Sequence, residues 1–151
     1  MDAVKQSNTF SDLSKLSALR QRLEVLRTGR WIPLWVDSGA SHEDDGIFAF
    51  ARASQDGSAF AVVVLNASDV PRITGADGGG MKLPNTLKTS GKILRPVLTI
   101  GTGVSISTIV DAAGVLRLNV PPSSLIIYEA APVVVSQESS PADGNGKLRS
   151  P

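Results

Sequence analysis

A stripe of apolar residues between Thr9 and Trp31 is the strongest pattern in the chain. Apolar side chains recur there every three or four positions, the spacing that places them on one face of an α-helix. They are Phe10, Leu13, Leu16, Leu19, Leu23 and Leu26. Thr9 and Asp12 have the spacing of a capping box, and Gly29 is suited to the left-handed conformation that ends many helices. The pattern predicts one amphipathic helix whose leucine face is buried.

The segment that follows the helix, residues 31–36, has the composition of a strand. Pro33 has no N–H to donate to a neighbour, which predicts that this strand lies at an edge. Trp31 and Trp35 are four residues apart, so on a regular strand they share a face and are candidate sugar-stacking residues. The alternative is that both pack at the seam between helix and strands. We favour packing, with Trp35 as the exposed one if either is exposed.

Two apolar runs further along the chain, 47–52 and 59–65, are joined by a short turn containing Gly57. A connection this short permits only antiparallel pairing, so we expect a hairpin. The second run carries three valines and is the candidate central strand. Shorter strand-like runs follow at a spacing typical of a sandwich, at 70–74, 94–100, 104–110, 115–120 and 125–128.

These patterns together predict a mainly β fold. We expect an antiparallel, Greek-key-like β-sandwich preceded by one amphipathic N-terminal helix, with a disordered C-terminal tail. The corresponding segments are 1–29 for the lead-in and helix, 30–130 for the sandwich and 131–151 for the tail. The tail is rich in Ser, Pro, Gly and charged residues, a composition that does not offset the entropy of ordering.

Composition limits the functions that this chain can have. A chain of 151 residues with 42% hydrophobic residues fits one domain with its own core. Its net charge of +1 offers no electrostatic footprint for nucleic acid or for an anionic membrane. The sequence has no export signal and no apolar run long enough to span a bilayer, which favours the cytoplasm. It has no cysteine, so thiolate chemistry and disulfides are excluded.

The polar residues offer little catalytic chemistry. Glu43, Asp44 and Asp45 are adjacent in one loop, where alternate side chains point apart, so we interpret them as a solvated group. His42, the sole histidine, lies in the same loop and supplies neither a triad nor a zinc site by itself. We therefore predict no catalytic residue, no metal site and no cofactor in this chain.

Two further motifs have structural interpretations. The glycines of residues 75–80 are followed by Pro84 instead of a helix, so we interpret this segment as a loop and not as a phosphate cradle. Asn66, Ala67 and Ser68 match the N-glycosylation triplet, but no export signal accompanies them, and we interpret them as a turn.

Four phrases of the sequence occur in the order found in a known enzyme family. They are LSALRQRLEVLRTGRW, GIFAFAR, FAVVVLNASDVPR and LRLNVPPSSLIIYE. Over residues 3–130 the chain resembles the end of α-amylase family glycoside hydrolases, in which the last helix of the catalytic barrel leads into a C-terminal β-sandwich. A complete barrel needs about 250 residues, so this chain has no room for one.

The resemblance implies a non-catalytic part of an enzyme that acts on α-glucans. The family's catalytic carboxylates lie upstream of everything resembled here, so we expect no hydrolysis by this chain alone. The implied partner is the catalytic barrel, contacted through the helix face of Phe10, Leu13, Leu16, Leu19, Leu23 and Leu26. Without a barrel we expect this face to self-associate or the helix to be mobile. The alternatives are an independent carbohydrate-binding module that uses Trp31 and Trp35, and a structural sandwich that binds a partner through its helix.

Overall fold

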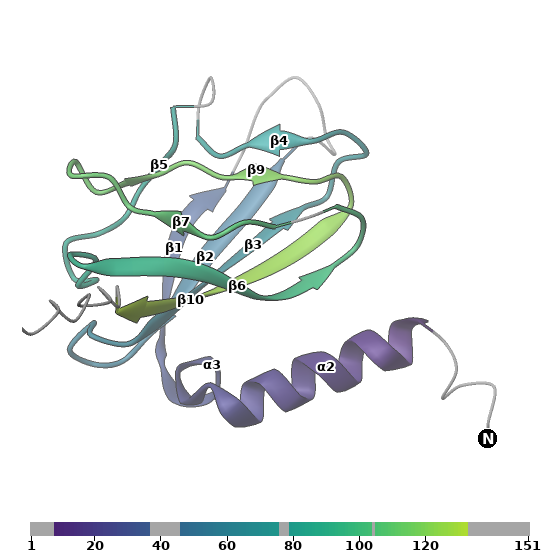
Figure 1. The fold of residues 1–151 in the computed structure, drawn as a ribbon, viewed down its shortest axis with the longest axis horizontal. Helices are drawn as coiled ribbons and strands as arrows, with labels where there is room; N and C mark the ends of the chain where they lie inside the picture. The colour runs from purple at the N-terminus through teal and green to yellow at the C-terminus, as the bar shows by residue number, and fades with distance from the viewer. Residues whose placement is uncertain (1–7, 37–45, 76–78, 104, 133–151) are drawn as a thin grey trace, which may run out of the picture.

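A computed structural model describes residues 8–36, 46–75, 79–103 and 105–132 (Figure 1). The chain begins with helices α2 (Asn8–Arg22) and α3 (Glu24–Thr28) and continues as strands. The strands are β1 (Arg30–Val36), β2 (Ile47–Ala53), β3 (Phe60–Asn66), β4 (Arg72–Ile73), β5 (Met81–Lys82), β6 (Lys92–Ile100), β7 (Thr108–Ile109), β8 (Val115–Leu116), β9 (Asn119–Val120) and β10 (Ser124–Pro132).

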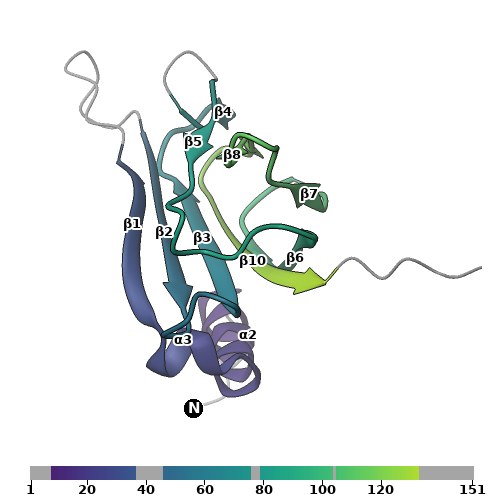
Figure 2. The ribbon, with the colours of Figure 1, turned by 90° about the vertical axis from the view of Figure 1, so that its left-hand side faces the viewer.

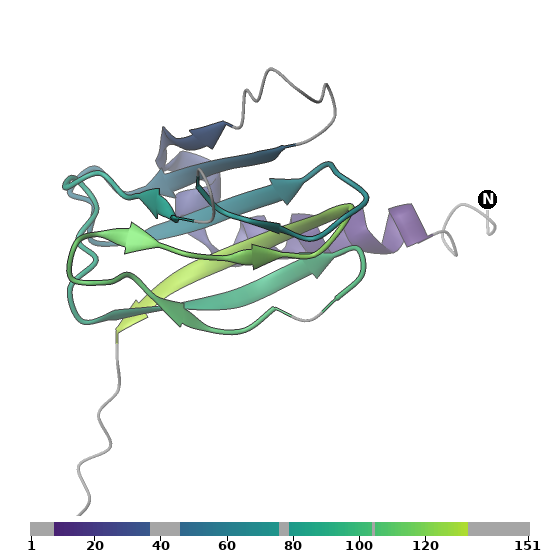
Figure 3. The same cartoon turned by 90° about the horizontal axis from the view of Figure 1, so that it is seen from above.

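The main sheet is antiparallel, and its six strands follow the order β1-β2-β3-β10-β6-β7. Two small ribbons, β4 with β9 and β5 with β8, form a second layer over one face of this sheet. Figure 3 shows α2 behind the main sheet, with this second layer in front. The prediction of a mainly β, sandwich-like fold with an N-terminal helix is therefore confirmed. The division into segments stays a prediction, but residues 131 and 132 of the proposed tail belong to β10, and residues 133–151 lie outside the described residues.

Strand β3 is buried on both faces, as its uninterrupted apolar sequence predicts. Phe60, Val62 and Val64 point into the core between the two layers. Ala61 and Val63 point the other way and pack with the helical segment. The hairpin of β2 and β3 and the edge position of β1 are also confirmed. Because β3 pairs with β2 on one side and β10 on the other, it is the central strand of the fold.

The helical segment departs from the prediction of one continuous helix. Leu23 has extended backbone angles, φ −98° and ψ 100°, and separates α2 from α3. Thr9 lies inside α2, which begins at Asn8, so the proposed capping box is wrong. Asp12 instead forms an ion pair with Lys15, at 3.1 Å.

The conformation expected for Gly29 is also wrong, although a glycine is needed there. Its φ of −60° and ψ of 148° are extended and not left-handed. A Cβ atom at this position would lie 2.5 Å from the carbonyl oxygen of Val25 and 2.9 Å from that of Ala53. Glycine is therefore required because α3 and β2 approach each other too closely for any side chain.

All five of the later strand-like runs differ in extent from the strands that form. Strands β4 and β6 replace the runs 70–74 and 94–100 with slightly different bounds. Residues 115–120 form two short strands, β8 and β9, instead of one. Among the described residues of the run 104–110, only Thr108 and Ile109 form a strand, β7. Strand β10 is longer than the run 125–128 that predicted it, because it extends to Pro132 at the end of its pairing with β6. The second layer over the inner face of β3 therefore contains only two-residue strands, β4, β5, β8 and β9.

Asn66 closes one end of the sandwich. Its side chain is fully buried, and its Nδ2 donates to the carbonyl oxygens of Val70, Val120 and Pro121 at 2.9, 3.1 and 3.0 Å. Its Oδ1 accepts a hydrogen bond from the amide of Ser68. One side chain thus ties the end of β3 to the corner between β9 and β10. The amide nitrogen that a glycan would need is occupied, which supports the interpretation of this triplet as a turn.

We expect Asn66→Asp to lower the free energy of unfolding by about 3 kcal/mol or more. The change replaces a donor with a carboxylate oxygen that faces three carbonyl oxygens in a buried site. Urea unfolding followed by circular dichroism measures the effect. Asn119→Asp is the matched control, because Asn119 is exposed on β9, and it should change stability by less than about 0.5 kcal/mol. Equal losses in the two variants would contradict this role of Asn66.

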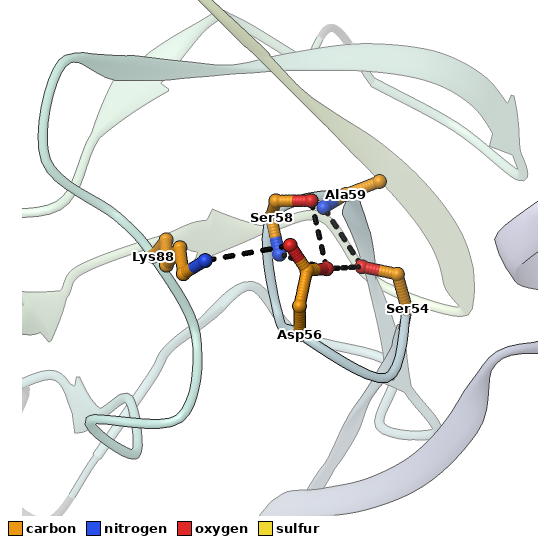
Figure 4. Close-up of polar contacts among 5 residues, drawn as sticks. All are labelled: Ser54, Asp56, Ser58, Ala59 and Lys88. Carbon is orange, nitrogen blue, oxygen red and sulfur yellow. Dashed lines mark hydrogen bonds and ion pairs between the residues drawn. The ribbon is translucent and has the colours of Figure 1, made fainter.

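The turn between β2 and β3 is organised by Asp56 (Figure 4). Its carboxylate accepts hydrogen bonds from the hydroxyls of Ser54 and Ser58 at 2.7 and 2.8 Å and from the amide of Ser58 at 3.1 Å. Lys88 lies 3.3 Å from the second oxygen and brings the loop before β6 to the turn. These donors, the Ser54 hydroxyl first, hold the pKa of Asp56 well below its usual range. Gly57 takes φ 70°, as the turn prediction requires.

This lowered pKa makes a prediction about acid stability. The carboxylate form is favoured in the folded state, so its stabilising effect is present above the unfolded pKa of about 4 and is lost as the pH falls below it. We expect the difference in urea midpoint between the wild type and Asp56→Asn to be largest near pH 7 and to shrink below pH about 4. A difference that grows on acidification would refute this. Asp69→Asn serves as the control, because Asp69 is exposed and lies outside this turn.

Candidate functional site

The outer face of the main sheet, opposite the second layer, is only partly covered by the helical segment. Leu19 and Leu23 are buried on this face against Ala61, Val63 and Ile127 of β3 and β10. The prediction of a buried leucine face is thus confirmed for the central part of the stripe. Strand β1 and much of β2 lie beyond the helix, at the free edge of the sheet (Figure 2).

A bulge in β1 places the two tryptophans on opposite faces. Trp31 is opposite Arg52 and Trp35 is opposite Ala49, with a shift in register between Pro33 and Trp35. The extra residue reverses the alternation of side chains along the strand. Trp35 therefore packs against the inner core, whereas Trp31 is 52% exposed on the outer face. The expectations that the two share a face and that Trp35 is the more exposed are both wrong. The favoured expectation that both pack holds for Trp35 but is wrong for Trp31.

Trp31 belongs to a row of apolar side chains on the uncovered part of the outer face. The ring centroids of Trp31 and Phe50 are 6.3 Å apart, and those of Phe50 and Phe48 are 5.7 Å apart. Leu65 lies directly opposite Phe48 on β3. Phe48 and Leu65 are each 38% exposed. This row is a larger aromatic surface than an isolated tryptophan provides.

The N-terminal part of α2 also exposes apolar side chains. Leu13 is 60% exposed and Phe10 is 41% exposed, so the end of the stripe furthest from Gly29 is not buried within this chain. At 100° per residue both lie on the same flank of the helix, turned away from the buried stripe of Leu19 and Leu23. Asp12 and Lys15 lie on the sheet-facing side of α2, beside the end of β6. We call the set of Phe10, Leu13, Trp31, Phe48, Phe50 and Leu65 the outer apolar surface.

Arginine side chains border this surface. Arg20 and Arg27 line a shallow hollow on the helix together with Leu13 and Leu16. Arg52 lies next to Trp31, and its guanidinium donates to the carbonyl oxygens of Val25 and Arg27 at the end of α3. The exposed carbonyls of that short helix are thereby satisfied. Among the described residues, arginines thus lie beside Leu13 on the helix and beside Trp31 on the sheet.

The other residues weighed for chemistry offer no site within the described parts of the chain. His42 and the acidic residues Glu43, Asp44 and Asp45 lie outside those parts. No group of three potential metal ligands occurs among the described residues. Residues 81–82, after the glycine-rich segment, form strand β5 and not a helix, which agrees with its interpretation as a loop. No described helix is long and apolar enough to cross a membrane.

Comparison with known proteins gives structural neighbours only. No protein-family model and no curated protein matches this chain. Among solved structures, it is similar to a trehalulose synthase (24% identity, TM-score 0.47), to trehalose-6-phosphate hydrolase of Bacillus licheniformis (18%, 0.49) and to an isomaltulose synthase of Erwinia rhapontici (17%, 0.49).

Each of these matches covers 78% of this chain but only 17% of the other chain. The three neighbours are α-amylase family enzymes, and the chain spans a small fraction of their length.

Trp31, Phe10 and Leu13 are candidate site residues from the sequence. Phe48, Phe50 and Leu65 were not expected from the sequence to lie on the surface. The alternation of rings with Ala49 and Ala51 shows that the rings share one face. Larger side chains are usually the buried ones, yet here the alanines line the inner core. The available signal was the small size of both alanines, which fits the closely packed side of a sandwich.

Leu19 is buried and Leu13 is exposed, so we predict that truncating the two side chains has different effects on stability. Leu19→Ala should lower the free energy of unfolding by about 2–4 kcal/mol, because Leu19 is only 6% exposed and its removal leaves a cavity against the sheet. Leu13→Ala is the matched control and should cost less than about 0.5 kcal/mol. Chemical denaturation of both variants measures this. A cost for Leu13→Ala as large as that for Leu19→Ala would mean that the N-terminal part of α2 is already packed in this chain.

Proposed function

We propose that this chain is the C-terminal part of an α-amylase-type glycoside hydrolase and stabilises a catalytic barrel through its outer apolar surface. The observation that carries the proposal is the apolar surface itself, which combines one flank of α2 with the aromatic row on β1 and β2. Exposed apolar surface of this extent is typical of an interaction site. The four phrases of the sequence that resemble the end of this enzyme family name the partner.

The position of the helix fits this role. Leu19 and Leu23 attach α2 to the sheet, while Phe10 and Leu13 are left on the side that faces away from it. In the proposed enzyme the same helix contacts the sandwich with one stripe and the barrel with the adjacent flank. The chain itself contributes no catalytic group to this arrangement, and the α-glucan substrate is bound and cleaved by the barrel.

A second candidate function is the binding of an α-glucan to the exposed ring of Trp31. The geometry of the aromatic row favours a protein partner over a sugar chain. The planes of Trp31 and Phe50 are inclined by 36°, and those of Phe48 and Phe50 by 47°. A flat sugar ring stacks on one such face, but inclined rings do not form a continuous platform and instead interlock with side chains of a partner. Saturable quenching of tryptophan emission by maltoheptaose, abolished by Trp31→Ala, would favour the sugar.

The first test of the proposed function is the coding sequence that adjoins Met1. We expect it to encode strand–helix repeats with paired carboxylates, in the same or an adjoining reading frame. The protein that contains both parts is then heated at a fixed temperature, and its residual hydrolytic activity on α-glucans is followed with time. Phe48→Asp should shorten the half-life of activity several-fold, because it places a charge in the interface between sandwich and barrel.

Ile109→Asp is the matched control for this experiment. Ile109 is 63% exposed on β7, away from the outer apolar surface, so the same change there should leave the half-life unaltered. An adjoining region that encodes no barrel would overturn the proposed partner. A half-life unchanged by Phe48→Asp would overturn the proposed interface.

A further inference from the structure

Arg20, Arg27 and Arg52 border the outer apolar surface, and none of them forms an ion pair with a described carboxylate. Arg20 and Arg27 lie beside the exposed Leu13, and Arg52 lies beside Trp31. Arg20 makes no hydrogen bond or ion pair with any described residue. Arg27 donates only to the carbonyl oxygen of Gln21, at 3.3 Å, within this same segment. These guanidinium groups are therefore available to a partner.

The described carboxylates lie elsewhere. Asp12 pairs with Lys15 on the sheet-facing side of α2. Glu129 pairs with Arg22 at 3.2 Å, and with Glu24 it lines a cleft at the end of the sheet. The remaining three belong to the turn after β2, the loop after β3 and the hairpin before β8; they are Asp56, Asp69 and Asp111. Asp12 and Glu129 are therefore already paired, with Lys15 and Arg22.

A protein interface is generally larger than an apolar patch, so it also covers the charged residues beside the patch. A stable interface buries about 800 Å² on each partner, whereas an apolar patch on a monomer is typically about 300–600 Å². A partner that covers this surface completely must therefore also cover the arginine rim. Covering a guanidinium group without an opposite charge carries a desolvation penalty that an ion pair offsets.

We infer that the outer apolar surface selects a partner that presents carboxylates opposite Arg20 and Arg27, and that it disfavours a second copy of this chain. Two copies joined face to face bring two such rims together and add no described acidic group. The inference rests on the proposed docking role and specifies the chemistry of the docked protein. It also modifies the expectation of self-association, which should require salt to screen the arginines.

The experiment uses only this chain and a charge-reversed variant as its partner. Arg20→Glu with Arg27→Glu gives a variant with the same apolar centre and an acidic rim, and Arg52 is left intact because it holds the end of α3. Sedimentation velocity at low salt is run on the wild type, on the variant and on their equimolar mixture. We expect the mixture to associate about tenfold more tightly than either protein alone, and 0.5 M salt to remove the difference.

Lys82→Glu with Arg117→Glu is the matched control, because it makes the same change in net charge on the second layer. Mixing this control with the wild type should give no gain. Circular dichroism confirms that each variant is folded. Wild-type self-association as tight as the mixture would overturn the inference, and so would an equal gain with the control pair or a mixture that stays monomeric. None of these outcomes involves the barrel, so the proposed partner is tested separately by the heating experiment.

Discussion

A central strand that is apolar on both faces has to be covered on both faces. Strand β3 has this property, since Phe60, Val62 and Val64 point to one side and Ala61 and Val63 point to the other. The second layer covers the first set, and Leu19 and Leu23 of the helical segment cover the second. Removing either layer would expose these apolar side chains to water, at a cost of roughly 25 cal/mol for each Å² exposed. The order of the sheet, with β10 placed beside β3, follows from the same need for paired neighbours.

The helical segment covers only part of the outer face of the main sheet. Its position determines which strands stay exposed on that face. The close approach of α3 to β2 at Gly29 fixes where the helical segment meets the sheet. From there α2 crosses β3, β10 and β6, and the edge formed by β1 and β2 is not reached. The aromatic row at that edge and the exposed N-terminal end of α2 are both left open to a partner. Because this surface cannot hold a protein and a glucan chain at once, the two candidate functions exclude each other.

Features that depend on local composition can be predicted from the sequence. Features that depend on one extra residue in a strand, or on one extended residue in a helix, cannot. The continuous apolar run of β3, the turn at Gly57 and the proline of β1 each identify their element, because composition determines these features. The bulge after Pro33 is different, since one extra residue reverses the face of Trp35 without leaving a mark in the sequence. The break at Leu23 lacks the glycine or proline that usually signals one. The exposure of Trp31 follows from how far the helix extends, which is a tertiary property.

The buried position of Asn66 has a consequence for how the chain can be produced. In a secretory pathway that glycosylates Asn-X-Ser triplets, sugar is attached while the polypeptide is still emerging, before the corner between β9 and β10 exists. A glycan on Nδ2 would then leave at most one hydrogen for the three carbonyl oxygens of Val70, Val120 and Pro121 and would not fit inside the sandwich. Such material should misfold because of its expression host and not because of its amino-acid sequence. A bacterial cytosol, which lacks this modification, is the suitable source of protein for study.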